Sequence, residues 1–234
     1  MATKESDKLY LDKIPFNGRS LDEYLAIFDL DLASLKDRAV LDVAGGPSSF
    51  SAEARKYCRY SLACDPSYGE RADNLLKTGL NDIADIKEKI EPVLGLYKWD
   101  FYKSPDRLKV IRVEVLKRFI VDYSNHLSKV KYIKGELPRL PFADKSFDLV
   151  LCGHFLFLFS DKLGYDFHLE SIKELARVCA DELRIFPLVG LDTTPYDRMD
   201  ELLDDLGKAG LTIEIRQVAF EFQRGANRTL IIKR

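Results

Sequence analysis

The chain has 234 residues, of which 46% are hydrophobic, so it can bury one substantial core, and this length suits a single α/β domain with an insertion. The formal charge of −2 gives no general attraction to nucleic acid or to an anionic membrane, and neither is expected as a partner. The four cysteines have no Cys-x-x-Cys spacing, which predicts free thiols and a cytoplasmic protein. The most apolar run, residues 147–159, is too short to cross a bilayer, and the first eight residues lack the apolar core of a signal peptide.

The first predicted element is a helix that begins after Ser20. Ser20 and Glu23 form a capping-box pattern, and apolar residues follow them at helical spacing. We expect this short helix to pack across the edge of a sheet or to cover a ligand cleft.

A strand, a tight turn and the start of a helix are predicted in residues 38–50. The aliphatic run at residues 39–43 ends in small residues, among which Gly45 and Gly46 let a ligand approach the backbone without a Cβ in the way. The helix predicted over residues 48–58 directs its free N–H groups into the same space.

A second short strand, residues 60–65, ends in the carboxylate of Asp65. A glycine turn after one strand and an acid at the tip of the next are features with which an α/β fold holds an adenosine ribose. These two strands therefore predict a nucleoside site, although a purely structural turn is the alternative interpretation of the glycines.

Residues 67–130 are too many for the connection to the third strand, since a minimal crossover needs about a dozen residues. Two amphipathic helices are predicted within them, one with a weak point at Gly79 and one that begins at Ser104 and Pro105. We interpret residues 67–130 as a helical insertion within a single domain of residues 1–234. Such an insertion emerges at the carboxyl ends of the strands, which favours a lid that selects the substrate.

The aromatic residues of the insertion have two interpretations. They line the substrate pocket, or they form the insertion's own core. They are Trp99, Phe101, Tyr102 and Tyr123.

The rest of the chain alternates between strand and helix patterns. Strands are predicted at residues 131–134, 147–151 and 183–189, followed by an antiparallel pair at residues 211–222 and 227–233. Helices are predicted from Leu169 to Cys179 and from Thr194 to a stop at Gly210.

Taken together, these residues resemble the class I S-adenosylmethionine-dependent methyltransferases, in particular the type 11/25-like group. The most specific likeness lies in residues 135–154, where Gly-Glu-Leu-Pro-Arg-Leu-Pro-Phe and Phe-Asp-Leu-Val-Leu-Cys-Gly-His are similar to the family's adenine-contacting turn, Leu-Pro-Phe loop and following strand. The resemblance implies a Rossmann-like three-layer sandwich. Its seven-stranded sheet would be mostly parallel with the last strand antiparallel, and the insertion would form a helical lid.

The resemblance also implies S-adenosylmethionine as the cofactor, S-adenosylhomocysteine as the product, and a small molecule as the methyl acceptor. Asp65 would accept both ribose hydroxyls, and Glu136 would take the adenine amino group. The implied cofactor-binding residues are Asp42, Ala44, Gly45, Gly46, Ser48, Asp65, Pro66, Glu136, Leu137, Cys152 and Gly153.

The chain departs from the family's Asp/Glu-x-Gly-x-Gly-x-Gly pattern at Ala44 and Ser48. Ala44 predicts an ordinary backbone conformation at that point, and Ser48 is expected to cap the helix or to hydrogen-bond the cofactor carboxylate. Residues 180–182 replace the Pro-Gly-Gly turn that usually precedes the fifth strand. Residues 44–49 lack both the first and the last glycine of the nicotinamide-binding motif Gly-x-Gly-x-x-Gly. This difference favours the sulfonium cofactor.

The implied chemistry needs few catalytic side chains, because a sulfonium is already a strong electrophile. His154 is the candidate base for an oxygen or nitrogen nucleophile, or else it only shapes the pocket. His126 and His168 lie in predicted helices and are expected at the surface or in packing, so no metal site is expected.

Methyl transfer to a small molecule is the first of three functional hypotheses. The second is attack at another carbon of the sulfonium, which releases methylthioadenosine, and the third is a non-catalytic module that binds the cofactor. An RNA or protein acceptor is disfavoured because the chain has no basic tract or separate recognition domain.

Overall fold

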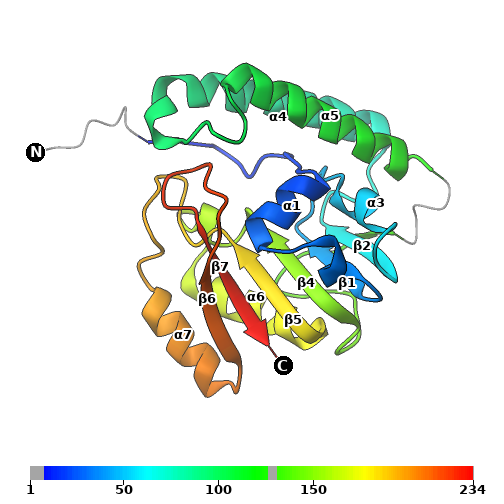
Figure 1. Cartoon of the computed structure of the whole chain (residues 1–234), viewed down its shortest axis with the longest axis vertical. Coiled ribbons are helices and arrows are strands. Elements are labelled where there is room, and N and C mark those ends of the chain that lie inside the picture. Colours follow the sequence, from blue (N-terminus) through cyan, green and yellow to red (C-terminus); the bar gives the residue numbers. More distant parts are fainter. Residues whose placement is uncertain (1–7, 126–130, 234) are drawn as a thin grey trace, which may run out of the picture.

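The structure is a computed structural model that describes residues 8–125 and 131–233. A twisted sheet forms its centre, and helices cover both faces (Figure 1). His126, which we expect at the surface or in packing, lies outside the described residues.

The sheet has seven strands in the order β3-β2-β1-β4-β5-β7-β6. Strand β7 is antiparallel to both of its neighbours, and the remaining pairs are parallel. This arrangement confirms the predicted mostly parallel sheet with an antiparallel last strand. The strands are β1 Ala39–Val43, β2 Tyr60–Asp65, β3 Tyr132–Lys134, β4 Phe147–Gly153, β5 Cys179–Phe186, β6 Thr212–Gln217 and β7 Arg228–Lys233.

Strand residues alternate between two apolar layers, as the pleat of a sheet requires. Val40 and Leu149 face the layer that contains helices α1 and α3, whereas Leu41 and Val150 face the layer that contains α6 and α7. Both faces are therefore buried. The helices are α1 Leu21–Phe28, α2 Leu32–Leu35, α3 Phe50–Ala54, α4 Ala72–Ile90, α5 Pro105–Tyr123, α6 Tyr165–Val178 and α7 Met199–Lys208, with 3-10 turns η2 Glu91–Leu96 and η4 Phe157–Phe159.

The predicted helix starts at Ser20 and Ser104 are confirmed. Ser20 forms a complete capping box with Glu23, and the Ser104 hydroxyl accepts a hydrogen bond from the Arg107 N–H at 3.1 Å. Both starts depend only on local side-chain to backbone contacts, which explains why the sequence reveals them.

Several element boundaries in the second half were predicted wrongly. Strand β5 begins at Cys179 rather than at residue 183, because Glu182 pairs with β4 on one side and with β7 on the other. The helix predicted from Thr194 begins only at Met199, since the Tyr196 N–H donates to the Leu188 carbonyl and the Thr194 carbonyl accepts the Gly190 N–H, which ties these residues to the segment after β5. Pairing partners far away in the chain decide these boundaries.

Two further elements are shorter than predicted. Helix α3 ends at Ala54 instead of reaching residue 58, and β6 ends at Gln217 instead of residue 222. The released segment, residues 218–227, connects β6 to β7.

The insertion consists of α4 and α5, which pack side by side above the carboxyl ends of the strands (Figure 1). Gly79 is the point of close approach between them, since a Cβ there would lie 2.8 Å from the side chain of Leu116. The glycine that interrupts the apolar pattern therefore serves packing, and it is not a weak point of the helix.

The N-terminal strap, which we define as residues 8–20, runs between this helical pair and the sheet (Figure 1). The Phe16 N–H donates to Asp82 of α4 at 2.8 Å, and the Arg19 N–H donates to the Ser48 hydroxyl at 3.0 Å. The strap is thus bonded to the insertion on one side and to the turn after β1 on the other.

A buried ion pair connects the insertion to helix α1. Arg112 of α5 donates to Glu23 at 2.7 Å, and the Tyr102 hydroxyl donates to the same carboxylate. Burial disfavours the charged form of Glu23, but Arg112 and Arg19 outweigh it and lower the pKa of this carboxyl below its usual value. Each charge in the pair therefore depends on its partner.

We expect Arg112→Ala to lower the free energy of unfolding by about 3–5 kcal/mol, because it leaves Glu23 as an uncompensated buried charge. Chemical denaturation measures this loss. Arg107→Ala is the control, since Arg107 is exposed on the same helix and its removal should change stability by at most about 0.5 kcal/mol. Equal losses in the two variants would contradict the dependence of Glu23 on Arg112.

Candidate functional site

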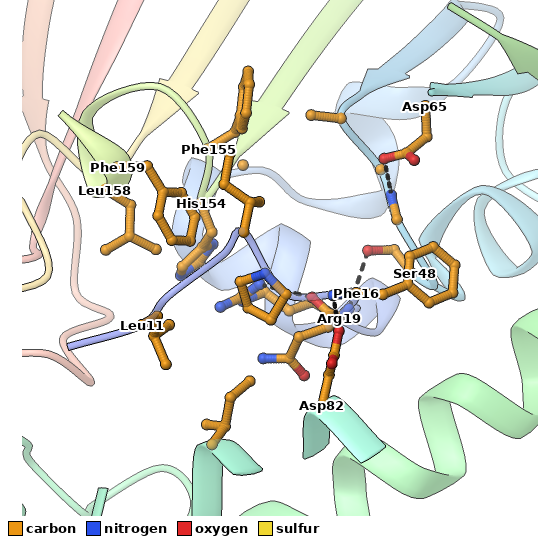
Figure 2. Close-up of a pocket in the computed structure, with 18 of the residues that line it drawn as sticks. Leu11, Phe16, Arg19, Ser48, Asp65, Asp82, His154, Phe155, Leu158 and Phe159 are labelled. Carbon is orange, nitrogen blue, oxygen red and sulfur yellow. Dashed lines mark hydrogen bonds between the residues drawn. The ribbon is translucent and has the colours of Figure 1, made fainter. Parts of the chain in front are cut away.

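A cavity of about 650 Å³ lies at the carboxyl ends of β1, β2 and β4. The strand ends form its floor, the strap and α4 cover it, and the connection between β6 and β7 closes one side (Figure 2). Its volume falls within the range of about 300–1,000 Å³ typical of small-molecule sites.

The turn after β1 forms the wall nearest to the strap. Gly46 has a φ of 50° and its N–H faces β2, while a Cβ on Gly45 would lie 2.7 Å from the Asp42 carboxylate. Both glycines are therefore required by the geometry.

Ala44 does not have the ordinary conformation that the sequence predicted. Its φ is 55°, in the left-handed region, where an L-residue other than glycine is strained by about 1–2 kcal/mol. The turn keeps the shape that a glycine would favour, and directly after Ala44 the backbone passes so close to Asp42 that a Cβ on Gly45 would lie 2.7 Å from its carboxylate.

Asp65 at the tip of β2 lies directly against the glycine turn. Its carboxylate accepts the Gly46 N–H at 2.9 Å and the Ser67 N–H at 2.9 Å (Figure 2). Burial raises the pKa of Asp65, whereas the bonds from Ser67 and Gly46 oppose that effect. The sequence-predicted acid and glycine turn thus meet at one point on the cavity wall.

The predicted cofactor residues divide into those that line the cavity and those behind its wall. Asp42 is 1% exposed and Cys152 is fully buried, and neither lines the cavity. The others do line it, together with His154: Ala44, Gly45, Gly46, Ser48, Asp65, Pro66, Glu136, Leu137 and Gly153.

Asp42 supports the turn from behind. Its Oδ1 accepts the Tyr24 hydroxyl at 2.8 Å, and its Oδ2 has no hydrogen-bond partner within the described residues. Burial, with a smaller contribution from the charge of Asp65, raises the pKa of Asp42 to about 8.

Ser48 does not cap the helix that follows it. Its hydroxyl accepts the Arg19 N–H, and the N-cap of α3 is Ser49, whose side chain makes no capping bond. Ser48 therefore joins the strap to the glycine turn, and this contact could not be inferred from spacing along the chain.

The strap is the part of the site that sequence reasoning missed. Gly18 packs directly on the turn, since a Cβ there would lie 2.2 Å from the backbone of Pro47. The only local signal is a proline and a glycine, Pro15 and Gly18, just before the capping box of α1.

His154 follows β4 and has a φ of 55°. Its backbone N–H donates to the Phe186 carbonyl at 2.6 Å, and its Nδ1 is buried without a hydrogen-bond partner in the described structure. Burial and the charges of Arg19 and Arg112 lower the pKa of His154 well below its usual value, so the imidazole is neutral at physiological pH.

None of the four aromatic residues proposed for the pocket lines the cavity, and Trp99, Phe101 and Tyr102 pack against Phe220 and Phe222 of the β6–β7 connection rather than within the insertion alone. Tyr102, for example, is 1% exposed and bonded to Glu23. The aromatic residues that do line the cavity come largely from outside the insertion: Phe16, Tyr24, Tyr97, Phe155, Phe159, Phe167, Phe186, Phe220 and Phe222.

His168 is a packing residue, as predicted. It is fully buried on α6, and its ring nitrogens contact the Gly164 and Leu156 carbonyls at 2.8 and 3.1 Å. Within residues 8–125 and 131–233, no group of three or more His, Cys, Asp or Glu side chains is placed to hold a metal ion, and no helix is long and apolar enough to span a membrane.

We expect Gly18→Ala to displace the strap, because its Cβ cannot fit against Pro47. Overpacking of this kind costs about 1–3 kcal/mol, so trypsin should cleave the strap at Lys13 or Arg19 at least about tenfold faster. Gly95→Ala is the control, since nothing lies within 4 Å of its added Cβ. Equal cleavage of the two variants would show that the strap does not depend on this contact.

A second prediction concerns pH. When folding raises the pKa of a carboxyl group, the folded protein loses stability as the pH rises from the pKa of that group in the unfolded chain toward its pKa in the folded protein. Between about pH 4 and about pH 8, Asp42→Asn should therefore gain stability relative to wild type, by up to about 1.4 kcal/mol per pH unit. Urea denaturation of both proteins across this range measures the difference, and a difference independent of pH would contradict the burial of an unpaired Asp42.

Comparison with known proteins gives one relative over nearly the whole chain. The uncharacterized protein MJ0045 of Methanocaldococcus jannaschii is 34% identical over 221 residues, which cover 93% of this chain and 95% of that protein. At this identity and coverage the two chains belong to one family.

Solved methyltransferase structures resemble the chain in fold at low sequence identity. A SAM-dependent methyltransferase from Aquifex aeolicus is 16% identical with a TM-score of 0.45, over 90% of this chain and 92% of that one. The magnesium protoporphyrin IX methyltransferase of Synechocystis PCC 6803, solved with bound SAM, is 15% identical with a TM-score of 0.48, over 92% of this chain and 77% of that one.

Residues 102–184 match the sequence profile of a family described as a methyltransferase domain. The matched region contains α5, β3, β4 and most of β5, and so includes the segment from Gly135 to His154. The chain thus belongs to one family with MJ0045 and matches a methyltransferase domain over residues 102–184, and its strand order and the glycine turn bonded to Asp65 accompany that match.

Proposed function

We propose that this protein transfers a methyl group from S-adenosylmethionine to a small-molecule acceptor held in the same cavity. The observation that carries the proposal is the contact between the Gly46 N–H and the Asp65 carboxylate on the wall of the cavity. The cavity volume of about 650 Å³ supports the presence of an acceptor beside the cofactor.

The residues present fit the nucleoside half of the cofactor. Asp65 accepts the Gly46 N–H and both the N–H and the hydroxyl of Ser67, so it can receive one ribose hydroxyl at its remaining acceptor site and a second in place of the Ser67 hydroxyl. Glu136 and Leu137, on the opposite side of Asp65 from the turn, would contact the adenine. Asp42 would support the turn beside the methionine end as a largely uncharged carboxyl, because burial raises its pKa to about 8.

The cofactor, when bound, supplies an electrophilic methyl group. The protein's own contribution is to align the acceptor, exclude water and remove the acceptor's proton where it has one. His154 is our candidate for that proton transfer, since its neutral imidazole lines the cavity and its Nδ1 lacks a partner.

We further propose that α4 and α5, with the strap beneath them, act as the lid that selects the acceptor. Leu75, Thr78 and Ile86 of α4 and Leu108 of α5 line the cavity, which supports this role. The buried pair between Arg112 and Glu23 fastens the lid to the domain. A cytoplasmic setting is proposed on the basis of the four free cysteines, none of which forms a disulfide.

Asp65→Ala should weaken binding of S-adenosylhomocysteine by more than about tenfold, because it removes the acceptor for the ribose hydroxyls. Isothermal titration measures the affinity, and a thermal melt checks that the variant is folded. Asp73→Ala is the control, since its side chain is 80% exposed, and it should bind like wild type. Unchanged affinity in Asp65→Ala would remove Asp65 from the cofactor site.

The reaction itself is tested by mass spectrometry after incubation with S-adenosylmethionine and a cell metabolite extract. We expect S-adenosylhomocysteine together with one methylated compound. Methylthioadenosine would indicate attack at another carbon, and tight binding without turnover would indicate a non-catalytic module.

A further inference from the structure

The two ends of the cavity differ in chemistry. Polar groups gather at the end that contains Asp65, whereas apolar side chains from four separate segments line the other end, and Figure 2 shows Leu11, Leu158 and Phe159 grouped together well away from Asp65. Phe186, Phe220 and Phe222 extend this apolar wall. A molecule that fills this end has a hydrocarbon or aromatic body.

One basic side chain in the cavity forms no direct ion pair with a carboxylate of the described residues, although its charge acts on Glu23, which Arg112 already pairs. Lys13 pairs with Asp82 at 2.6 Å, and Arg112 pairs with Glu23 at 2.7 Å. The guanidinium of Arg19 makes only a 3.4 Å contact to the Asn17 carbonyl, and no carboxylate in residues 8–125 or 131–233 forms an ion pair with it.

An unpaired cation in such surroundings is costly. Burial lowers the pKa of Arg19 to about 10, which still leaves it charged at neutral pH. A buried guanidinium gains most from an anion that forms two parallel hydrogen bonds with it, such as a carboxylate.

Arg19 lies between the two ends. Its backbone N–H bonds to Ser48 of the glycine turn, and its charge, after burial, helps to lower the pKa of His154.

We propose that the methyl acceptor is a hydrophobic carboxylate, whose anionic group binds Arg19 and whose apolar body fills the end of the cavity between Leu11, Leu158 and Phe222. This inference rests on the proposed function and specifies its substrate class.

Matched pairs of probes test the proposal: 2-naphthoate against 2-naphthalenemethanol, and octanoate against octanol. Titration into the complex of wild type with S-adenosylhomocysteine should give at least about tenfold tighter binding of each acid than of its alcohol. Arg19→Met should abolish that preference. Lys13→Met is the control, because Lys13 lines the same cavity but is neutralised by Asp82, and it should keep the preference.

Equal binding of acid and alcohol by wild type, or no binding of any probe at millimolar concentration, would overturn the proposal. A carboxylate is also present in the methionine portion of the cofactor, so Arg19→Met is also titrated with S-adenosylhomocysteine and with methylthioadenosine. Loss of affinity for S-adenosylhomocysteine alone would assign Arg19 to the cofactor and overturn the inference. Failure of the proposed function gives a different result from failure of this inference. If the function is wrong, wild type itself does not bind S-adenosylhomocysteine.

Discussion

The hydrogen bond from the Gly46 N–H to the Asp65 carboxylate is the contact on which the site depends. It joins the ends of two adjacent parallel strands, whose register brings Val43 opposite Cys64. Parallel pairing places both strand ends at one edge of the sheet, where open α/β folds bind ligands. The rest of the cavity is built around this point, with the strap above it and β4 beside it.

Two buried polar atoms beside the cavity have no hydrogen-bond partner within the described residues, the Oδ2 of Asp42 and the Nδ1 of His154. Burial raises the pKa of Asp42 to about 8 and lowers the pKa of His154, so both groups are largely uncharged at neutral pH. The guanidinium of Arg19 lines the cavity with one 3.4 Å contact to the Asn17 carbonyl. The proposed carboxylate acceptor would therefore find its charged partner in Arg19.

The insertion is held in place by charge as well as by apolar packing. Arg112 reaches from α5 to Glu23 of α1, and Phe16 of the strap bonds to Asp82 of α4. An opening motion of the whole helical pair would expose a buried ion pair. The strap is also bonded on both sides, through Lys13 to Asp82 and through Arg19 to Ser48.

The sequence by itself determined the strand and helix order, the glycine turn, Asp65 and the capping residues Ser20 and Ser104. These features depend on local backbone conformation and on the spacing of apolar residues, and both can be recognised from residues that are neighbours in the chain. Tertiary structure alone decided that the strap covers the turn, that Ala44 has a positive φ, that β5 begins at Cys179 and that Arg19 lacks an acid. Each of those outcomes depends on atoms far away in the chain, such as Pro47 against Gly18, and no local pattern records such a contact.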